Sequence, residues 1–165
     1  MRQPSRTAGL VLLFVVLVAL HYSARPVLAW RAGADFLLIG VLLIAVRMRP
    51  GTAALVGLAA GVASDALSPA AFGAGAMAMT LVATMASWLK AEFFAEHLGL
   101  TAVFLLGGKL AFDAIFLLME QRIGVGEIAM QLITWSLLSA MVTAIAGLTV
   151  LVIFRPFTDI VGRRA

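Results

Sequence analysis

The chain has no cysteine and very few charged residues. Of its 165 residues, 12% are charged and 63% are hydrophobic, whereas soluble domains are typically about a quarter charged and about half apolar. The missing cysteines exclude disulfides and thiolate metal sites. The low charge excludes a soluble globular domain, because so few charges cannot cover a water-facing surface of this size. Once six membrane-spanning helices of about 20 residues each are placed, the length leaves no room for an extramembrane catalytic or nucleic-acid-binding domain.

Charged and turn-forming residues divide the sequence into six apolar stretches. They predict an all-α integral membrane protein with one domain, residues 1–165, and six transmembrane helices. Pro50-Gly51 predicts a turn before the third helix, and Ser68-Pro69 predicts the N-terminus of the fourth. The expected spans are about 7–24, 33–46, 52–67, 69–89, 98–119 and 128–154.

The distribution of Lys and Arg predicts the orientation, because cytoplasmic connections carry an excess of positive charge. One side of the predicted bundle holds eight of these residues: Arg2, Arg6, Arg47, Arg49, Lys90, Arg155, Arg163 and Arg164. The other side holds three: Arg25, Arg31 and Arg122. We therefore expect a multi-pass protein with both termini in the cytoplasm. We also expect the first span to be retained, since more membrane segments follow it rather than an exported domain.

The third span carries small residues and an acid at four-residue intervals: Gly57, Gly61 and Asp65. This spacing aligns them on one helix face, and faces of small residues allow transmembrane helices to pack closely. Packing within the bundle is the simpler interpretation, and an interface with a partner helix is the alternative. Asp65 precedes the Ser68-Pro69 break, where its carboxylate could satisfy backbone donors at the start of the next helix or bind a partner or ligand.

Two charges lie inside the fifth predicted span. Lys109 falls near the middle of that span, and Asp113 follows four residues later on the same face. A lone charge at this depth costs several kcal/mol, so we expect a buried ion pair. A polar site for a ligand or for protons is the alternative. Asp35 is interpreted as an interfacial group near Arg31.

Sequence features of enzymes are missing. His21 and His97 lie near opposite ends of the predicted bundle, and neither has a second ligand at metal-binding spacing. There is no glycine-rich phosphate loop, nucleophile elbow or pair of carboxylates suited to catalysis. The sequence therefore predicts neither a catalytic site nor a metal or cofactor, and it disfavours an enzyme.

The run GLAAGVASDALSPAAFGAGAMAM, residues 57–79, together with the six-span layout, resembles the rod shape-determining protein MreD family. The matching residues are Gly57, Gly61, Asp65, Ser68-Pro69 and Phe72-Gly73. They make Gly57, Gly61, Asp65, Pro69 and Gly73 the candidate helix-packing or partner interface. The layout matches over the whole chain and the motif over about 20 residues.

The resemblance implies a non-enzymatic scaffold in the inner membrane of bacteria, acting in cell elongation. MreD-like proteins bind MreC and through it link MreB filaments to the peptidoglycan polymerase RodA and its partner transpeptidase. No small-molecule substrate is implied. The family also resembles in fold the substrate-binding S components of energy-coupling-factor transporters. An S component that binds a vitamin is therefore the alternative function.

Overall fold

The computed structural model describes residues 14–21, 23, 33–66, 72–89, 98–120 and 125–162. Within these ranges the chain is all-helical and contains no strand. The first described helix, residues 14–21, lies inside the first predicted span. Residues 7–13, 22 and 24 of that span lie outside the described residues, as do Ser68, Pro69 and His97.

Helices α2 and α3 have clear local starts. Helix α2 (Phe36–Ala45) is capped by Asp35, whose side chain accepts a hydrogen bond from the Leu38 N–H. Helix α3 (Pro50–Asp65) begins at Pro50, two residues earlier than predicted. Proline favours the first helical position because its missing N–H would have no helical partner there. The turn therefore precedes Pro50 rather than containing it.

Helix α4 (Ala74–Trp88) begins five residues later than the start predicted from Ser68-Pro69. Its N-cap residue is Gly73, which has a φ of 98°. This left-handed conformation cannot continue a right-handed helix and is accessible to glycine at little cost. The prediction that Ser68-Pro69 starts the helix is therefore wrong, and a turn at Phe72-Gly73 sets the boundary.

The two longest helical segments form the second half of the chain. Helix α5 (Leu98–Glu120) ends one residue beyond the predicted span. The next segment is one continuous helix made of α6 (Val125–Gln131), the π-helical stretch η3 (Leu132–Ser136) and α7 (Leu137–Gly162). It begins before the predicted residue 128 and continues through the tail beyond residue 154. The helix is therefore longer than the predicted span, while the apolar part long enough to cross a membrane, Gly126–Ile153, ends one residue before the predicted end.

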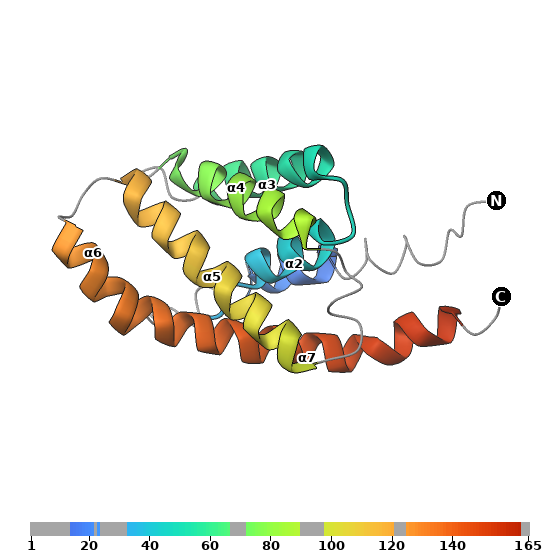
Figure 1. Cartoon of the computed structure of the whole chain (residues 1–165). Helices are drawn as coiled ribbons and strands as arrows, with labels where there is room; N and C mark the ends of the chain where they lie inside the picture. The colour runs from blue at the N-terminus through green and yellow to red at the C-terminus, as the bar shows by residue number, and fades with distance from the viewer. Residues whose placement is uncertain are drawn as a thin grey trace.

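The helices pack as a bundle around α2. Helix α3 lies along α4, α5 crosses α7, and α2 lies between these two pairs, in contact with all four (Figure 1). The centre of the bundle is filled by side chains of α2, including Leu38, Val41 and Leu42, which are completely buried. This explains why α2 is apolar all round.

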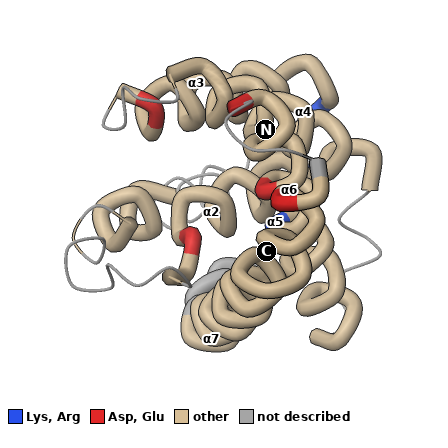
Figure 2. The backbone as a smooth tube through the Cα atoms, turned by 90° about the vertical axis from the view of Figure 1, so that its left-hand side faces the viewer, with Lys and Arg blue, Asp and Glu red and all other residues tan. Residues whose placement is uncertain are grey.

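Large apolar side chains cover much of the outside. Leu55, Leu81, Val103 and Ile145, from four different helices, are all exposed, and charged residues are sparse along the described helices (Figure 2). Among the described residues, two helices are long and apolar enough to cross a membrane, Leu98–Glu120 and Gly126–Ile153. The other two apolar helices, α2 and α4, are shorter. At 1.5 Å per residue, the ten residues of α2 extend only about 15 Å.

Candidate functional site

Asp65 and Gly73, two of the residues that carry the family resemblance, meet where α3 ends and α4 begins. The Asp65 side chain is buried at the last position of α3. Its Oδ2 atom accepts hydrogen bonds from the Gly73 N–H at 2.8 Å and the Ala76 N–H at 2.9 Å. Asp65 thus acts as a cap for a helix that lacks a side-chain cap of its own. A carboxylate is well suited to this position because the N-terminus of a helix carries partial positive charge.

The small residues of α3 lie against the backbone of α4. A Cβ atom added at Gly57 would clash with the carbonyl group of Met79, and one added at Gly61 would clash with the backbone of Gly75 and Ala76. At Gly75, an added Cβ would overlap the Asp65 carboxylate. Close approach of the two helices therefore requires glycine at these positions. The small face of α3 is occupied by α4, as the intramolecular interpretation expects, so it is not open to a partner helix in this structure.

The second polar site is a buried cluster centred on Lys109, whose exposed fraction is 7%. The Lys109 Nζ atom lies 2.6 Å from Asp113 Oδ1 and 3.5 Å from Asp35 Oδ2. It also lies 5.0 Å from the centre of the Phe112 ring, at cation–π distance. The i,i+4 pair expected from the sequence is thus present, with a second carboxylate beside it.

Asp35 connects this cluster to three further segments of the chain. Its backbone N–H donates to Thr143 Oγ1 on α7 at 3.2 Å, and its carboxylate caps α2. Its Oδ1 atom lies 3.7 Å from the Nδ1 atom of His21. The same His21 atom accepts a hydrogen bond from the Leu37 N–H at 3.4 Å, so His21 links Asp35 to the first turn of α2. Asp35, interpreted from the sequence as an interfacial group, thus also contacts Lys109 and His21, whereas Arg31 lies outside the described residues.

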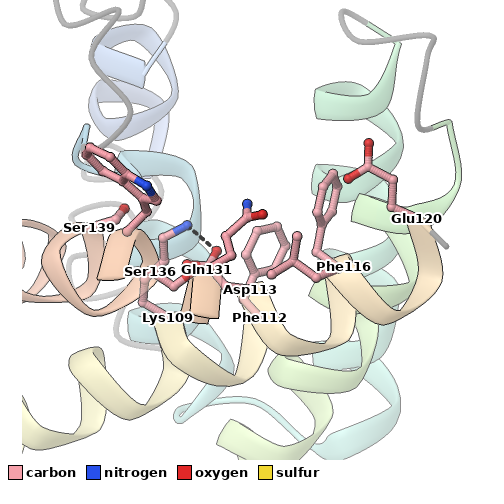
Figure 3. Close-up of a pocket in the computed structure, with 10 residues that line it drawn as sticks. Lys109, Phe112, Asp113, Phe116, Glu120, Gln131, Ser136 and Ser139 are labelled. Carbon is pink, nitrogen blue, oxygen red and sulfur yellow. Dashed lines mark hydrogen bonds and ion pairs between the residues drawn. The ribbon is translucent and has the colours of Figure 1, made fainter. Parts of the chain in front are cut away.

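A cleft of about 280 Å³ opens beside the cluster, between α5 and the α6–η3–α7 helix. Figure 3 shows Lys109 and Asp113 extending from α5 toward Ser136 on the facing helix. The polar lining residues are Lys109, Asp113, Glu120, Gln131, Ser136 and Ser139. The apolar lining residues are Phe112, Phe116, Leu117 and Trp135.

The wall opposite α5 is π-helical. Trp135 and Ser136, which belong to η3, both line the cleft. A π-helical turn inserts one additional residue and rotates the following side chains relative to an α-helix, and such turns are frequent at functional sites. Here the change lies between Gln131 and Ser139, which also line the cleft. Residues on both sides of the π-helical turn thus face the same space.

The sequence predicted two residues of this site and missed the others. Lys109 and Asp113 could be predicted as a pair because they are neighbours on one helix. Asp35 and His21 join them across sequence separations that no local pattern encodes. Ser136 and Ser139 are single polar residues in an apolar run, and their alignment depends on the π-helical turn. The available signal was that these two serines are isolated polar residues in the last predicted span. The sequence did not show that both face the same side of the helix.

No known protein-family model matches this chain, and no curated protein or solved structure matches it either.

Proposed function

We propose that the protein is a non-enzymatic scaffold of the bacterial inner membrane that acts in cell elongation in the manner of MreD proteins. Six helices cross the membrane in this proposal, and both termini lie in the cytoplasm. The protein binds MreC within the bilayer and, through it, couples MreB filaments to RodA and its partner transpeptidase.

The observation that carries the proposal is the α3–α4 hairpin. Gly57, Gly61, Asp65 and Gly73, which carry the resemblance to the MreD family, belong to one physical unit. The two α3 glycines admit the α4 backbone, Asp65 caps α4, and Gly73 provides the turn that the cap requires. These four residues therefore build one structural feature, the close packing of α3 against a capped α4. A similarity that arose only from amino-acid composition would not place them at one helix–helix contact.

The outer surface also supports this proposal. Exposed apolar residues at four-residue spacing, Met77, Leu81 and Met85, form a stripe along α4. In water a surface of this kind would favour aggregation, whereas in a bilayer it contacts lipid or other helices. A scaffold acts through such contacts and needs no catalytic group.

The test is co-purification of the tagged full-length chain with MreC from the same organism, combined with depletion of the protein in growing cells. We expect MreC to be retained in mild detergent and rods to become round on depletion. The proposal would be contradicted if MreC did not co-purify and the cells stayed rod-shaped on depletion.

Substitutions from one apolar residue to a larger one can locate the interface. Lipid chains adapt to a larger side chain, whereas a packed helix does not. We therefore suggest separate Leu55→Trp, Leu81→Trp, Val103→Trp and Ile145→Trp variants, each at an exposed position on a different helix. If MreC no longer co-purifies with one variant but still co-purifies with the other three, the substituted helix is the one that MreC contacts.

The cleft beside Lys109 favours a second candidate, the S component of a vitamin transporter. That protein would need a cleft able to enclose and orient its ligand, and about 280 Å³ lies just below the usual range for ligand sites. Co-purification with transporter ATPases, or a vitamin retained by the purified chain, would favour this candidate over the scaffold.

A further inference from the structure

Among the described residues, the Lys109 cluster beside the cleft holds more negative than positive charge. Lys109 supplies one positive charge, and Asp35 and Asp113 supply two negative ones. The His21 Nδ1 atom beside Asp35 accepts the Leu37 N–H and so donates no hydrogen bond to this carboxylate. A surplus negative charge is costly in a site shielded from water. Either a proton or a bound cation must therefore compensate it.

Five of the six polar residues that line the cleft offer acceptor oxygens: Asp113, Glu120, Gln131, Ser136 and Ser139. Lys109 directs its ammonium group at two carboxylates, so two of its three donors are already engaged. The Ser139 hydroxyl donates to the Gly33 carbonyl oxygen at 3.2 Å and presents its lone pairs to other groups. Asp113 accepts only when ionised. A ligand that fits this lining supplies donors and a positive charge.

The size and the walls of the cleft indicate an organic cation. Its volume of about 280 Å³ corresponds to roughly nine water molecules, which is far more than one metal ion occupies. Phe112 and Phe116 stack with their ring centres 5.9 Å apart, and Trp135 lies on the opposite wall. Aromatic faces attract ammonium groups, and the Phe112 ring already has the Lys109 ammonium 5.0 Å from its centre.

We propose that the cleft between α5 and the α6–η3–α7 helix binds a primary ammonium group, carried by a small organic amine or by an aminophospholipid headgroup. The ammonium group donates hydrogen bonds to Asp113 and to the hydroxyl oxygens of Ser136 and Ser139. The aromatic residues enclose the adjoining carbon atoms. The cleft extends along α5 from Lys109 to Glu120, the last residue of the helix.

A lipid source is tested by competition in nanodiscs. The full-length chain is placed in a bilayer containing equal amounts of phosphatidylethanolamine, phosphatidylcholine and phosphatidylglycerol, and the retained lipids are counted by native mass spectrometry. Phosphatidylcholine is the control lipid because its quaternary ammonium has the same charge but no N–H donors. We expect phosphatidylethanolamine to be retained at least fivefold more often than phosphatidylcholine.

A soluble source is tested by titration with butylammonium, with butanol as the neutral control of similar shape. Trp135 serves as the fluorescent probe in a chain that also carries Trp30→Phe and Trp88→Phe. A response to butylammonium that is at least tenfold stronger than the response to butanol supports the site. Butylammonium binding without a lipid preference identifies a soluble amine as the ligand, and the reverse identifies a lipid.

Asp113→Asn is the decisive variant. It removes the surplus charge, yet Lys109 keeps Asp35 at 3.5 Å, so no buried lysine is left alone. We expect at least a tenfold loss of amine affinity, or loss of the lipid preference. Phe116→Leu keeps every charge and should weaken binding severalfold, which provides a second test should Asp113→Asn unfold.

The matched control is Asp159→Asn, which removes the same charge from a distant position on α7. Ser139 is the last residue of α7 that lines the cleft, and Asp159 follows it by 159 − 139 = 20 residues. At 1.5 Å per residue this places Asp159 about 30 Å further along the helix. Amine binding should therefore be unchanged in this variant.

Two results would overturn the proposal. One is equal retention of phosphatidylethanolamine and phosphatidylcholine together with equal responses to butylammonium and butanol. The other is unchanged amine binding in both Asp113→Asn and Phe116→Leu. Co-purification of MreC with the same variants reports separately on the scaffold. A chain that binds MreC but no amine retains its proposed function while the cleft assignment fails.

Discussion

The Oδ2 atom of Asp65 accepts a hydrogen bond from the backbone N–H of Ala76 at 2.9 Å, eleven residues later in the chain. This contact joins the end of α3 to the first turn of α4 and is buried from solvent. Asp65→Ala should therefore lower the free energy of unfolding by about 2 kcal/mol, since two backbone donors lose their acceptor. Asp65→Asn keeps one acceptor oxygen and should cost less. Thermal unfolding in detergent, followed by circular dichroism, measures both. Equal stability of the alanine variant and the natural chain would contradict the capping role.

Gly61→Leu should separate α3 from α4. An added Cβ alone would already meet the backbone of Gly75 and Ala76, so the larger side chain forces the helices apart. Overpacking of this kind usually costs about 1 to 3 kcal/mol, and contact with rigid backbone places this variant at the upper end.

The matched control is Gly107→Leu, because a Cβ at Gly107 has no atom within 4 Å. This variant should retain or slightly increase stability, since leucine favours helix more than glycine does. Comparable losses in Gly61→Leu and Gly107→Leu would show that close approach of α3 and α4 is not the cause.

Lys109→Met should be one of the most destabilising single substitutions in the chain. It leaves Asp35 and Asp113 buried without the ammonium group between them, and removal of one partner from a buried ion pair costs about 3 to 5 kcal/mol. The combined variant Lys109→Met/Asp113→Asn should lose less free energy of unfolding than the two single variants lose together, because one of the uncompensated charges is removed as well. Denaturant unfolding of all four chains gives the coupling energy. Strict additivity would mean that Lys109 and Asp113 do not interact.

Cysteine labelling can test the proposed orientation. The natural chain contains no cysteine, so each introduced cysteine is a unique reporter. We expect Arg6→Cys and Arg163→Cys to react with a membrane-impermeant maleimide only after the cells are opened. Arg122→Cys, in the predicted outer connection, should react in intact cells. Labelling of Arg6→Cys in intact cells would reverse the proposed topology.

The helical class, the approximate positions of the described helices and the pairing of Lys109 with Asp113 could be predicted from the sequence alone. These features depend on apolar run length, on capping and breaking residues, and on the four-residue repeat of one helix. The fourth helix shows the limit of this reasoning. Proline and serine both favour a helix start, yet the start follows Gly73, because Asp65 satisfies the exposed donors there.

The contacts of the polar residues depend on how the helices pack against one another. Gly57 and Gly61 could have packed against any helix, and the fold places α4 there. Asp35 and Lys109 are far apart in sequence, and they meet because α2 lies between the α3–α4 and α5–α7 pairs. The cleft depends in addition on the π-helical turn, which aligns side chains on both sides of it. Such contacts arise from the relative placement of whole helices, and a periodicity within one helix carries no information about its neighbours.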